Sequence, residues 1–137
     1  MPKIFISYRR EDTQTTANRL YDLLEAHYGE DDEENVFLDV DSIPLGHNFI
    51  EYLEDKVDQC DVLLSLIGRK WLTAINEKGK SHLKDGDDFV RIEILSGLKL
   101  EKIVIPTLVH GADMPEANSM PKELDEFSQM QAARLRQ

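Results

Sequence analysis

The chain has 137 residues, 41% hydrophobic and 31% charged, which predicts one globular domain with a single core. Its 27 acidic and 16 basic residues give a net charge of −11, which argues against nucleic-acid or anionic-membrane binding because no basic excess is available to neutralise phosphates. A single cysteine, Cys60, excludes an internal disulfide and is interpreted as a small buried thiol in a reducing compartment. With no signal-peptide pattern and no apolar run near the roughly 18 residues of a membrane span, we expect a cytoplasmic protein.

The amino-terminal half opens the alternation of strands and helices that is typical of a parallel sheet covered on both faces. A first strand is expected over 3–7. A helix capped by Asp12 or Thr13 is expected to run from there to about Tyr28. The acidic run at 30–34 is interpreted as a solvated loop and not as a metal site, because adjacent loop carboxylates have no ordered geometry.

The rest of the chain continues the alternation. The apolar run at 62–67 is typical of a central parallel strand, and the polar loop up to Asp88 is long enough to suggest a functional or mobile segment. Pro106, inside an expected strand over 103–109, requires an edge position or a bulge because proline lacks the N–H donor. The other expected elements are a strand at 36–40, a helix capped by Asn48, a helix at 89–100, a short helix near 122–127 and a short fifth strand within 129–135.

Polar residues follow the ends of the expected strands. Ser7 to Arg10 follow the first strand, Asp39 and Asp41 close the second, and Trp71 lies just after the third. The carboxyl ends of parallel strands meet at one edge of a sheet, which is where ligands bind in doubly wound folds. The sequence therefore predicts a ligand site at this edge.

Glu93 is the strongest candidate for chemistry. Apolar residues nearly encircle the helix expected at 89–100, so this carboxylate is predicted to be buried. A buried carboxylate must be paired, neutralised or functional. Two interpretations stay open: a structural ion pair with an arginine, and a functional carboxylate in an apolar cleft.

Several segments, taken in order, resemble the Toll/interleukin-1 receptor (TIR) domain, in particular the bacterial kind that cleaves NAD+. The resemblance covers nearly the whole chain. It implies a flavodoxin-like doubly wound α/β fold with about five parallel strands and helices on both faces. The segments are IFISYRRED at 4–12, VFLDVDSIPLG at 36–46 (the second strand and the BB loop), DVLLSLIGRKWL at 61–72, DFVRIEI at 88–94 and IVIP at 103–106.

The resemblance implies that Glu93 is the catalytic glutamate of an NAD+ glycohydrolase. Members of the family usually carry a tryptophan four residues earlier; here Phe89 takes that place, one helical turn away on the same face. One carboxylate suffices for this reaction, because the nicotinamide of NAD+ is already cationic and departs neutral, whereas ordinary glycosidases need a second carboxyl as acid. The expected products are nicotinamide and ADP-ribose or a cyclic ADP-ribose.

Further site residues are predicted around Glu93. Arg9 and Arg10 are candidates for the NAD+ pyrophosphate, the alternative being surface arginines paired with Glu11 or Asp12. The remaining substrate-binding predictions are Phe5 and Ser7 as pocket lining, Asp39 and Asp41 as ribose contacts or loop supports, Trp71 as a stacking platform or a core residue, and Phe89.

The second functional hypothesis is a non-enzymatic adaptor that associates with other TIR domains. The resemblance places self-association on the BB loop, which comprises Ser42, Ile43, Pro44, Leu45 and Gly46. The expected partners are NAD+ as substrate, further TIR domains and a fused sensor or effector domain. The fused domain is expected because the abrupt end at Gln137 suggests a domain cut from a longer protein. The expected setting is bacterial defence signalling. No cofactor or metal is expected, because no Gly-rich dinucleotide motif and no Cys/His cluster is present. A phospho-accepting receiver domain is disfavoured because Gly68, and not an aspartate, ends the third strand.

Overall fold

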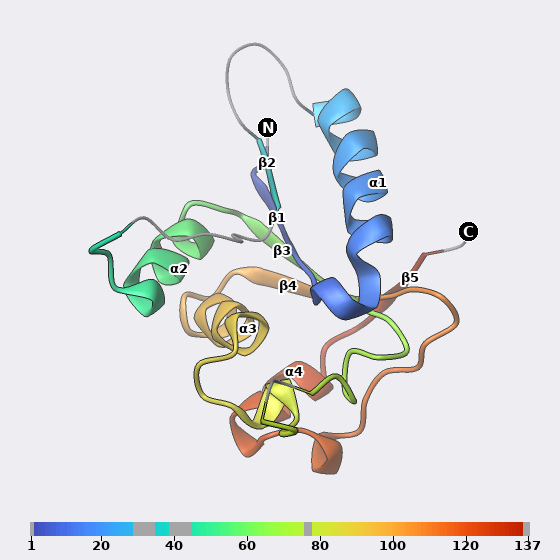
Figure 1. Ribbon diagram of the computed structural model, residues 1–137. Helices are drawn as coiled ribbons and strands as arrows, with labels where there is room; N and C mark the ends of the chain where they lie inside the picture. The colour runs from blue at the N-terminus through green and yellow to red at the C-terminus, as the bar shows by residue number, and fades with distance from the viewer. Residues whose placement is uncertain (1, 29–34, 39–44, 76–77, 136–137) are drawn as a thin grey trace.

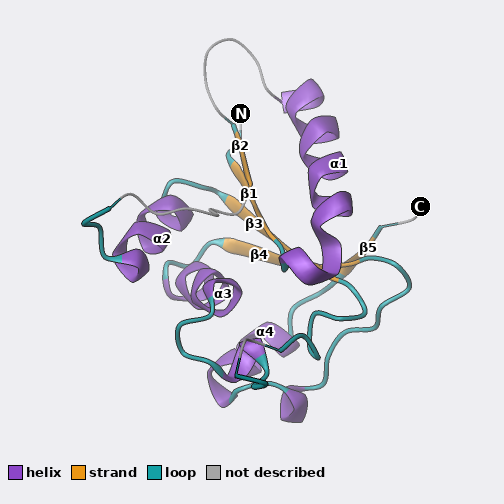
Figure 2. Cartoon of the chain, in the orientation of Figure 1, coloured by secondary structure: helices purple, strands orange, loops and turns teal. Residues whose placement is uncertain are grey.

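The computed structural model describes residues 2–28, 35–38, 45–75 and 78–135. Its centre is a five-stranded sheet in which all neighbouring strands are parallel, in the order β2-β1-β3-β4-β5 (Figures 1 and 2). This arrangement confirms the predicted doubly wound α/β fold, including its short fifth strand. The strands are β1 (Ile4–Ser7), β2 (Val36–Leu38), β3 (Val62–Ile67), β4 (Ile103–Leu108) and β5 (Ala133–Arg134).

Helices cover both faces of the sheet (Figure 2). Alternate residues of a strand point to opposite faces, so each strand contributes to two cores. Ile4, Ile6 and Leu66 pack with Ala17 of α1 on one face. On the other face, Phe5, Leu63 and Ile67 pack with Val57 of α2 and Ile94 of α3. The helices are α1 (Arg10–Tyr28), α2 (Phe49–Asp58), α3 (Phe89–Lys99) and α4 (Asp125–Ser128), with short 3-10 turns η1 (His82–Lys84), η2 (Ala117–Ser119) and η3 (Lys122–Leu124).

The start of α1 differs from the prediction. The helix begins at Arg10, and Thr13 interrupts it with φ −136° and ψ 25°, so neither Asp12 nor Thr13 caps it. The Asp12 carboxylate instead accepts hydrogen bonds from the backbone N–H groups of Gly68 and Lys70, both at 2.8 Å. A side chain bound to the exit of β3 is not available to cap its own helix, and the sequence holds no local sign of this distant partner.

The residues just before α2 and α3 cap these two helices. Asn48 accepts hydrogen bonds from the backbone of Ile50 and Glu51 and caps α2 as predicted. Asp88 does the same for α3 by accepting from the backbone of Arg91. Among the described helices, none has the length and apolar character needed to cross a membrane.

Pro106 occupies an edge position in an interior strand. β4 lies between β3 and β5, but β5 pairs only with Thr107 and Leu108 of β4. At Pro106 the register gives a partner on the β3 side, Ser65. Proline lacks an N–H donor, and Pro106 lies at the part of β4 that pairs with β3 but not with β5. This position agrees with the predicted edge position.

Candidate functional site

Ser7 and Glu93 meet at the carboxyl edge of the sheet. The Ser7 hydroxyl, at the end of β1, donates a hydrogen bond of 2.8 Å to Oε1 of Glu93 on α3. Both residues are 0% exposed, which confirms the predicted burial of Glu93. The carboxylate is thus held by a neutral donor inside an apolar layer, a setting in which its interactions are stronger than in water.

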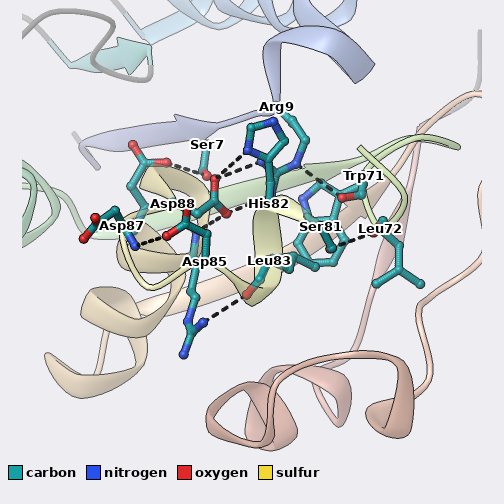
Figure 3. Close-up of polar contacts among 12 residues, drawn as sticks. Ser7, Arg9, Trp71, Leu72, Ser81, His82, Leu83, Asp85, Asp87 and Asp88 are labelled. Carbon is teal, nitrogen blue, oxygen red and sulfur yellow. Dashed lines mark hydrogen bonds and ion pairs between the residues drawn. The ribbon is translucent and has the colours of Figure 1, made fainter. Parts of the chain in front are cut away.

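Arg9 lies two residues further along the chain and is also buried, at 3% exposure. Its guanidinium binds Asp88 through two bonds of 2.9 Å, and its Nε donates to the backbone oxygen of Trp71 at 3.3 Å (Figure 3). The alternative interpretation of Arg9, as a surface arginine paired with Glu11 or Asp12, is therefore wrong. Its partner is 79 residues away in the chain, and only the fold brings the two together.

A pocket of about 630 Å³ opens beside this ion pair. Residues from Tyr8 to Glu11 form one wall, and Ile75 with residues between Lys78 and Val90 forms the other. Arg9, Arg10 and Phe89 are the predicted substrate-binding residues that line it, whereas Ser7 and Glu93 are not among its lining residues. The full lining is Tyr8, Arg9, Arg10, Glu11, Ile75, Lys78, His82, Asp85, Asp87, Asp88, Phe89 and Val90.

Phe89 connects the pocket with the buried carboxylate. It is half-buried, lines the pocket and lies one helical turn before Glu93 on α3. Its ring stacks on Phe49 of α2, with centroids 5.8 Å apart and an interplanar angle of 25°. The aromatic expected before the glutamate is therefore present, and packing against α2 fixes its orientation.

Phe5 and Trp71 belong to the hydrophobic core and not to the pocket. Phe5 is 0% and Trp71 1% exposed, and the Trp71 ring packs on Phe127 with centroids 5.9 Å apart. Neither side chain lines the pocket in this structure, because both point into the layer between the sheet and the helices. The core interpretation that the sequence offered for both residues describes their packing.

Only part of the predicted BB loop can be compared with the structure. Asp39, Asp41, Ser42, Ile43 and Pro44 lie outside the described residues. Leu45 is 100% exposed, and Gly46 adopts a φ of +84°, a backbone conformation that favours glycine. The described end of this loop therefore presents a large apolar side chain to solvent.

Two residues of the site, Asp88 and His82, had no role predicted from the sequence. An aspartate just before an apolar helix is a recognisable capping signal, so the helix-capping role of Asp88 was open to prediction. His82 places Nε2 3.5 Å from a Glu11 oxygen and Nδ1 3.9 Å from an Asp88 oxygen. No local pattern marks His82, because its partner Glu11 lies in a distant segment at the start of α1.

Within residues 2–28, 35–38, 45–75 and 78–135, no three His, Cys, Asp or Glu side chains gather as metal ligands would. Cys60 is 1% exposed, and this burial raises the pKa of its thiol to about 11, against a smaller opposing effect of Lys102. A thiol with so high a pKa stays protonated and is a poor nucleophile. The buried-thiol interpretation of Cys60 is therefore confirmed.

A parallel sheet with helices on both faces, and with polar side chains gathered at its carboxyl edge, defines an α/β domain of the doubly wound class. The family model of the TIR domain matches residues 4–137, and the chain belongs to the TIR domain family.

Solved TIR domains share the fold. The TIR domains of the activated Roq1 resistosome, which recognises the pathogen effector XopQ, superpose with a TM-score of 0.67 at 13% identity, covering 98% of this chain and 88% of that one. The TIR domain of the Toll-related receptor TRR-2 from Hydra magnipapillata gives a TM-score of 0.60 at 15% identity, with 98% and 84% covered. No curated protein sequence matches the chain.

Proposed function

We propose that this TIR domain cleaves NAD+ between nicotinamide and ribose, with Glu93 as the catalytic carboxylate. The observation that carries the proposal is the position of Glu93: 0% exposed on an apolar helix, hydrogen-bonded to Ser7 at the carboxyl edge of the sheet. A carboxylate is costly to bury, and such a group beside a pocket is a candidate for function.

The chemistry requires little more than this one negative charge. The nicotinamide ring of NAD+ leaves as a neutral molecule, so no acid has to protonate it. The ribose left behind develops positive charge at its anomeric carbon. A fixed carboxylate in a dry site stabilises that charge without having to reorganise, and it can also accept hydrogen bonds from the ribose hydroxyls. Attack by water gives ADP-ribose, and attack by a group of the adenine gives a cyclic product.

The pocket supplies the route to Glu93. Phe89 lies at one pocket wall, one turn from the carboxylate, and Arg10 is an exposed cation on the opposite wall. We assign the nicotinamide end of the substrate to the Phe89 side and the pyrophosphate to Arg10. Because Glu93 is fully buried in the structure, substrate binding must open the layer above it.

Association with other TIR domains is the proposed trigger for that opening. The structural relative from Roq1 comes from an activated resistosome that holds more than one TIR domain. A partner domain that binds the open form better than the closed one shifts the equilibrium towards the open form. Activity would then depend on assembly, as expected for a signalling enzyme that is silent when dilute.

The experiment is a nicotinamide-release assay on concentrated protein, with the sugar products separated by chromatography. Glu93→Gln keeps the shape of the side chain and removes its charge, so it should retain the fold and lose cleavage by at least about 10³-fold. Glu126→Gln, an exposed glutamate on α4, is the matched control and should keep full activity. Turnover retained by Glu93→Gln contradicts the assignment, as does a folded wild-type chain that releases no nicotinamide at high concentration.

A non-enzymatic adaptor is the second candidate. The full exposure of Leu45, within the predicted self-association loop, favours it, because an apolar side chain in solvent is suited to a protein partner. An adaptor would show association that depends on Leu45 while wild-type protein and Glu93→Gln remain equally inactive towards NAD+.

A further inference from the structure

We propose that Arg9 is a positioning residue, which fixes the amino end of α3 and thereby the orientation of Glu93, and not a contact to the substrate. This inference rests on the proposed function for its catalytic consequence. Its structural part, that the Arg9–Asp88 pair holds the start of α3 in place, can be tested without NAD+.

The geometry of Arg9 is that of a structural clamp. Nη1 and Nη2 each donate to a different oxygen of Asp88 at 2.9 Å, and Nε donates to the Trp71 backbone. The side chains are 3% and 6% exposed, so water competes little for the pair. Arginine binds a carboxylate with two parallel bonds only in one relative orientation, so the contact fixes an angle as well as a distance.

Asp88 transmits this constraint to the helix. Its Oδ2, which pairs with Arg9, also accepts the backbone N–H of Arg91 at 3.2 Å, and its backbone oxygen accepts from Ile92 at 3.0 Å. One carboxylate therefore joins the end of β1 to the first turn of α3. Any displacement of Asp88 displaces the turn that carries Phe89 and leads into Glu93.

The Ser7–Glu93 bond provides the second attachment. Ser7 and Arg9 are two residues apart at the end of β1, and Asp88 and Glu93 are five apart along the start of α3. One attachment leaves a helix free to pivot, whereas two attachments on successive turns also fix its tilt. Catalysis by a charged group requires placement this tight, since a shift of about 1 Å can cost about 10²-fold in rate.

Arg9 is poorly placed to bind a phosphate. Both of its terminal nitrogens already bind Asp88, so a pyrophosphate would have to displace a buried carboxylate that also caps a helix. Breaking a buried pair leaves an uncompensated charge. Arg10 is exposed on the same pocket wall, so a phosphate can reach it without breaking the buried Arg9–Asp88 pair.

A double-mutant cycle separates positioning from substrate binding. The variants are Arg9→Gln, Asp88→Asn and the two combined; asparagine retains the capping oxygen, and the combined variant leaves no unpaired charge. We expect each single change to lower kcat by about 10- to 100-fold with KM within about twofold, and the combined change to cost no more than a single one. The inference is overturned if Arg9→Gln raises KM at unchanged kcat while Asp88→Asn is silent, or if the two losses multiply.

The matched control is the Arg91–Glu123 pair, which joins the same helix to η3 and not to β1. Arg91→Gln combined with Glu123→Gln should leave kcat within about twofold of wild type. A loss equal to that of the Arg9 and Asp88 variants would show that any ion pair on α3 has this effect, and would overturn a specific role for Arg9.

Amide hydrogen exchange tests the structural part alone. In the combined Arg9 and Asp88 variant, exchange at Ile92 and Glu93 should rise about tenfold, while the Arg91 and Glu123 control leaves it unchanged. Unchanged exchange in the combined variant overturns the positioning role, whatever the NAD+ assay shows. Wild-type protein that releases no nicotinamide overturns the proposed function instead, and the exchange result still decides whether Arg9 holds α3.

Discussion

The Ser7 hydroxyl lies 2.8 Å from Oε1 of Glu93, and this contact spans 86 residues of sequence between β1 and α3. It provides a hydrogen-bond donor to a carboxylate that is fully removed from water. It also links β1, whose motif resembles the first strand of TIR domains, to the helix that carries the proposed catalytic group. The two features that the sequence marked separately are therefore parts of one site.

Removing that hydroxyl should weaken both the fold and the reaction. Ser7→Ala leaves a buried carboxylate oxygen without its donor, which we expect to cost about 1–3 kcal/mol of unfolding free energy. The loss of orientation should lower the rate of NAD+ cleavage by about tenfold. Urea denaturation and steady-state kinetics measure the two effects.

Ser65 offers the matched control for Ser7. It is the register partner of Ser7 on β3, it is equally buried, and its Oγ has no hydrogen-bond partner among the described residues. Ser65→Ala should therefore be neutral or stabilising. Equal destabilisation by Ser7→Ala and Ser65→Ala would contradict a specific role for the contact with Glu93.

Gly68 should not tolerate a side chain. A Cβ at this position would lie 2.5 Å from Oδ1 of Asp12 and 2.7 Å from Cγ2 of Thr13. Gly68→Ala should push Asp12 off the backbone N–H groups that it binds and lower the unfolding free energy by about 1–3 kcal/mol. At Gly86 a Cβ would meet nothing within 4 Å, so Gly86→Ala should change stability by less than about 0.5 kcal/mol in the same denaturation assay. A tolerated alanine at 68 would show that the bonds from the Gly68 and Lys70 backbone to Asp12 contribute little to stability.

Cys60 should make stability fall at alkaline pH. Burial raises the pKa of the folded thiol from 9.0 to about 11, so above pH 9 the thiol ionises in the unfolded chain first. The contribution of the protonated thiol to the free energy of unfolding is fully present below pH 9.0 and is lost as the pH rises towards 11. The total loss of unfolding free energy is about 3 kcal/mol. Denaturation of wild type and Cys60→Ala at pH 8 and pH 10.5 measures it. The difference between the two proteins should shrink at the higher pH; a constant difference would refute the prediction.

Activity should rise faster than linearly with protein concentration if association opens the site. Leu45→Asp places a charge on a fully exposed apolar residue, so it should leave the isolated fold intact and lower activity at a given concentration by at least about tenfold. Leu23→Asp, on a leucine of α1 that is 64% exposed, is the control and should have little effect. Activity strictly proportional to enzyme down to nanomolar concentration would exclude this mechanism.

Local sequence patterns determined the order of the strands and helices and the burial of Glu93. Alternation of apolar runs and helical periodicity predicted the order of strands and helices, Asn48 was recognisable as a cap, and the apolar surroundings of Glu93 in the helical pattern predicted its burial. These features depend on neighbours within about one or two turns, and such neighbours are visible in the sequence.

Tertiary structure decided which side chains contact one another. Asp12 binds the exit of β3 instead of capping α1, Arg9 pairs with Asp88 instead of facing solvent, and Trp71 fills the core beside Phe127. Each depends on a contact between segments more than 50 residues apart, as the separations of 56 for Asp12 to Gly68 and 79 for Arg9 to Asp88 show. The free energy of such a contact comes from burial, which exists only once the layers have packed. The sequence therefore indicated which residues were candidates, and packing determined which of them form the site.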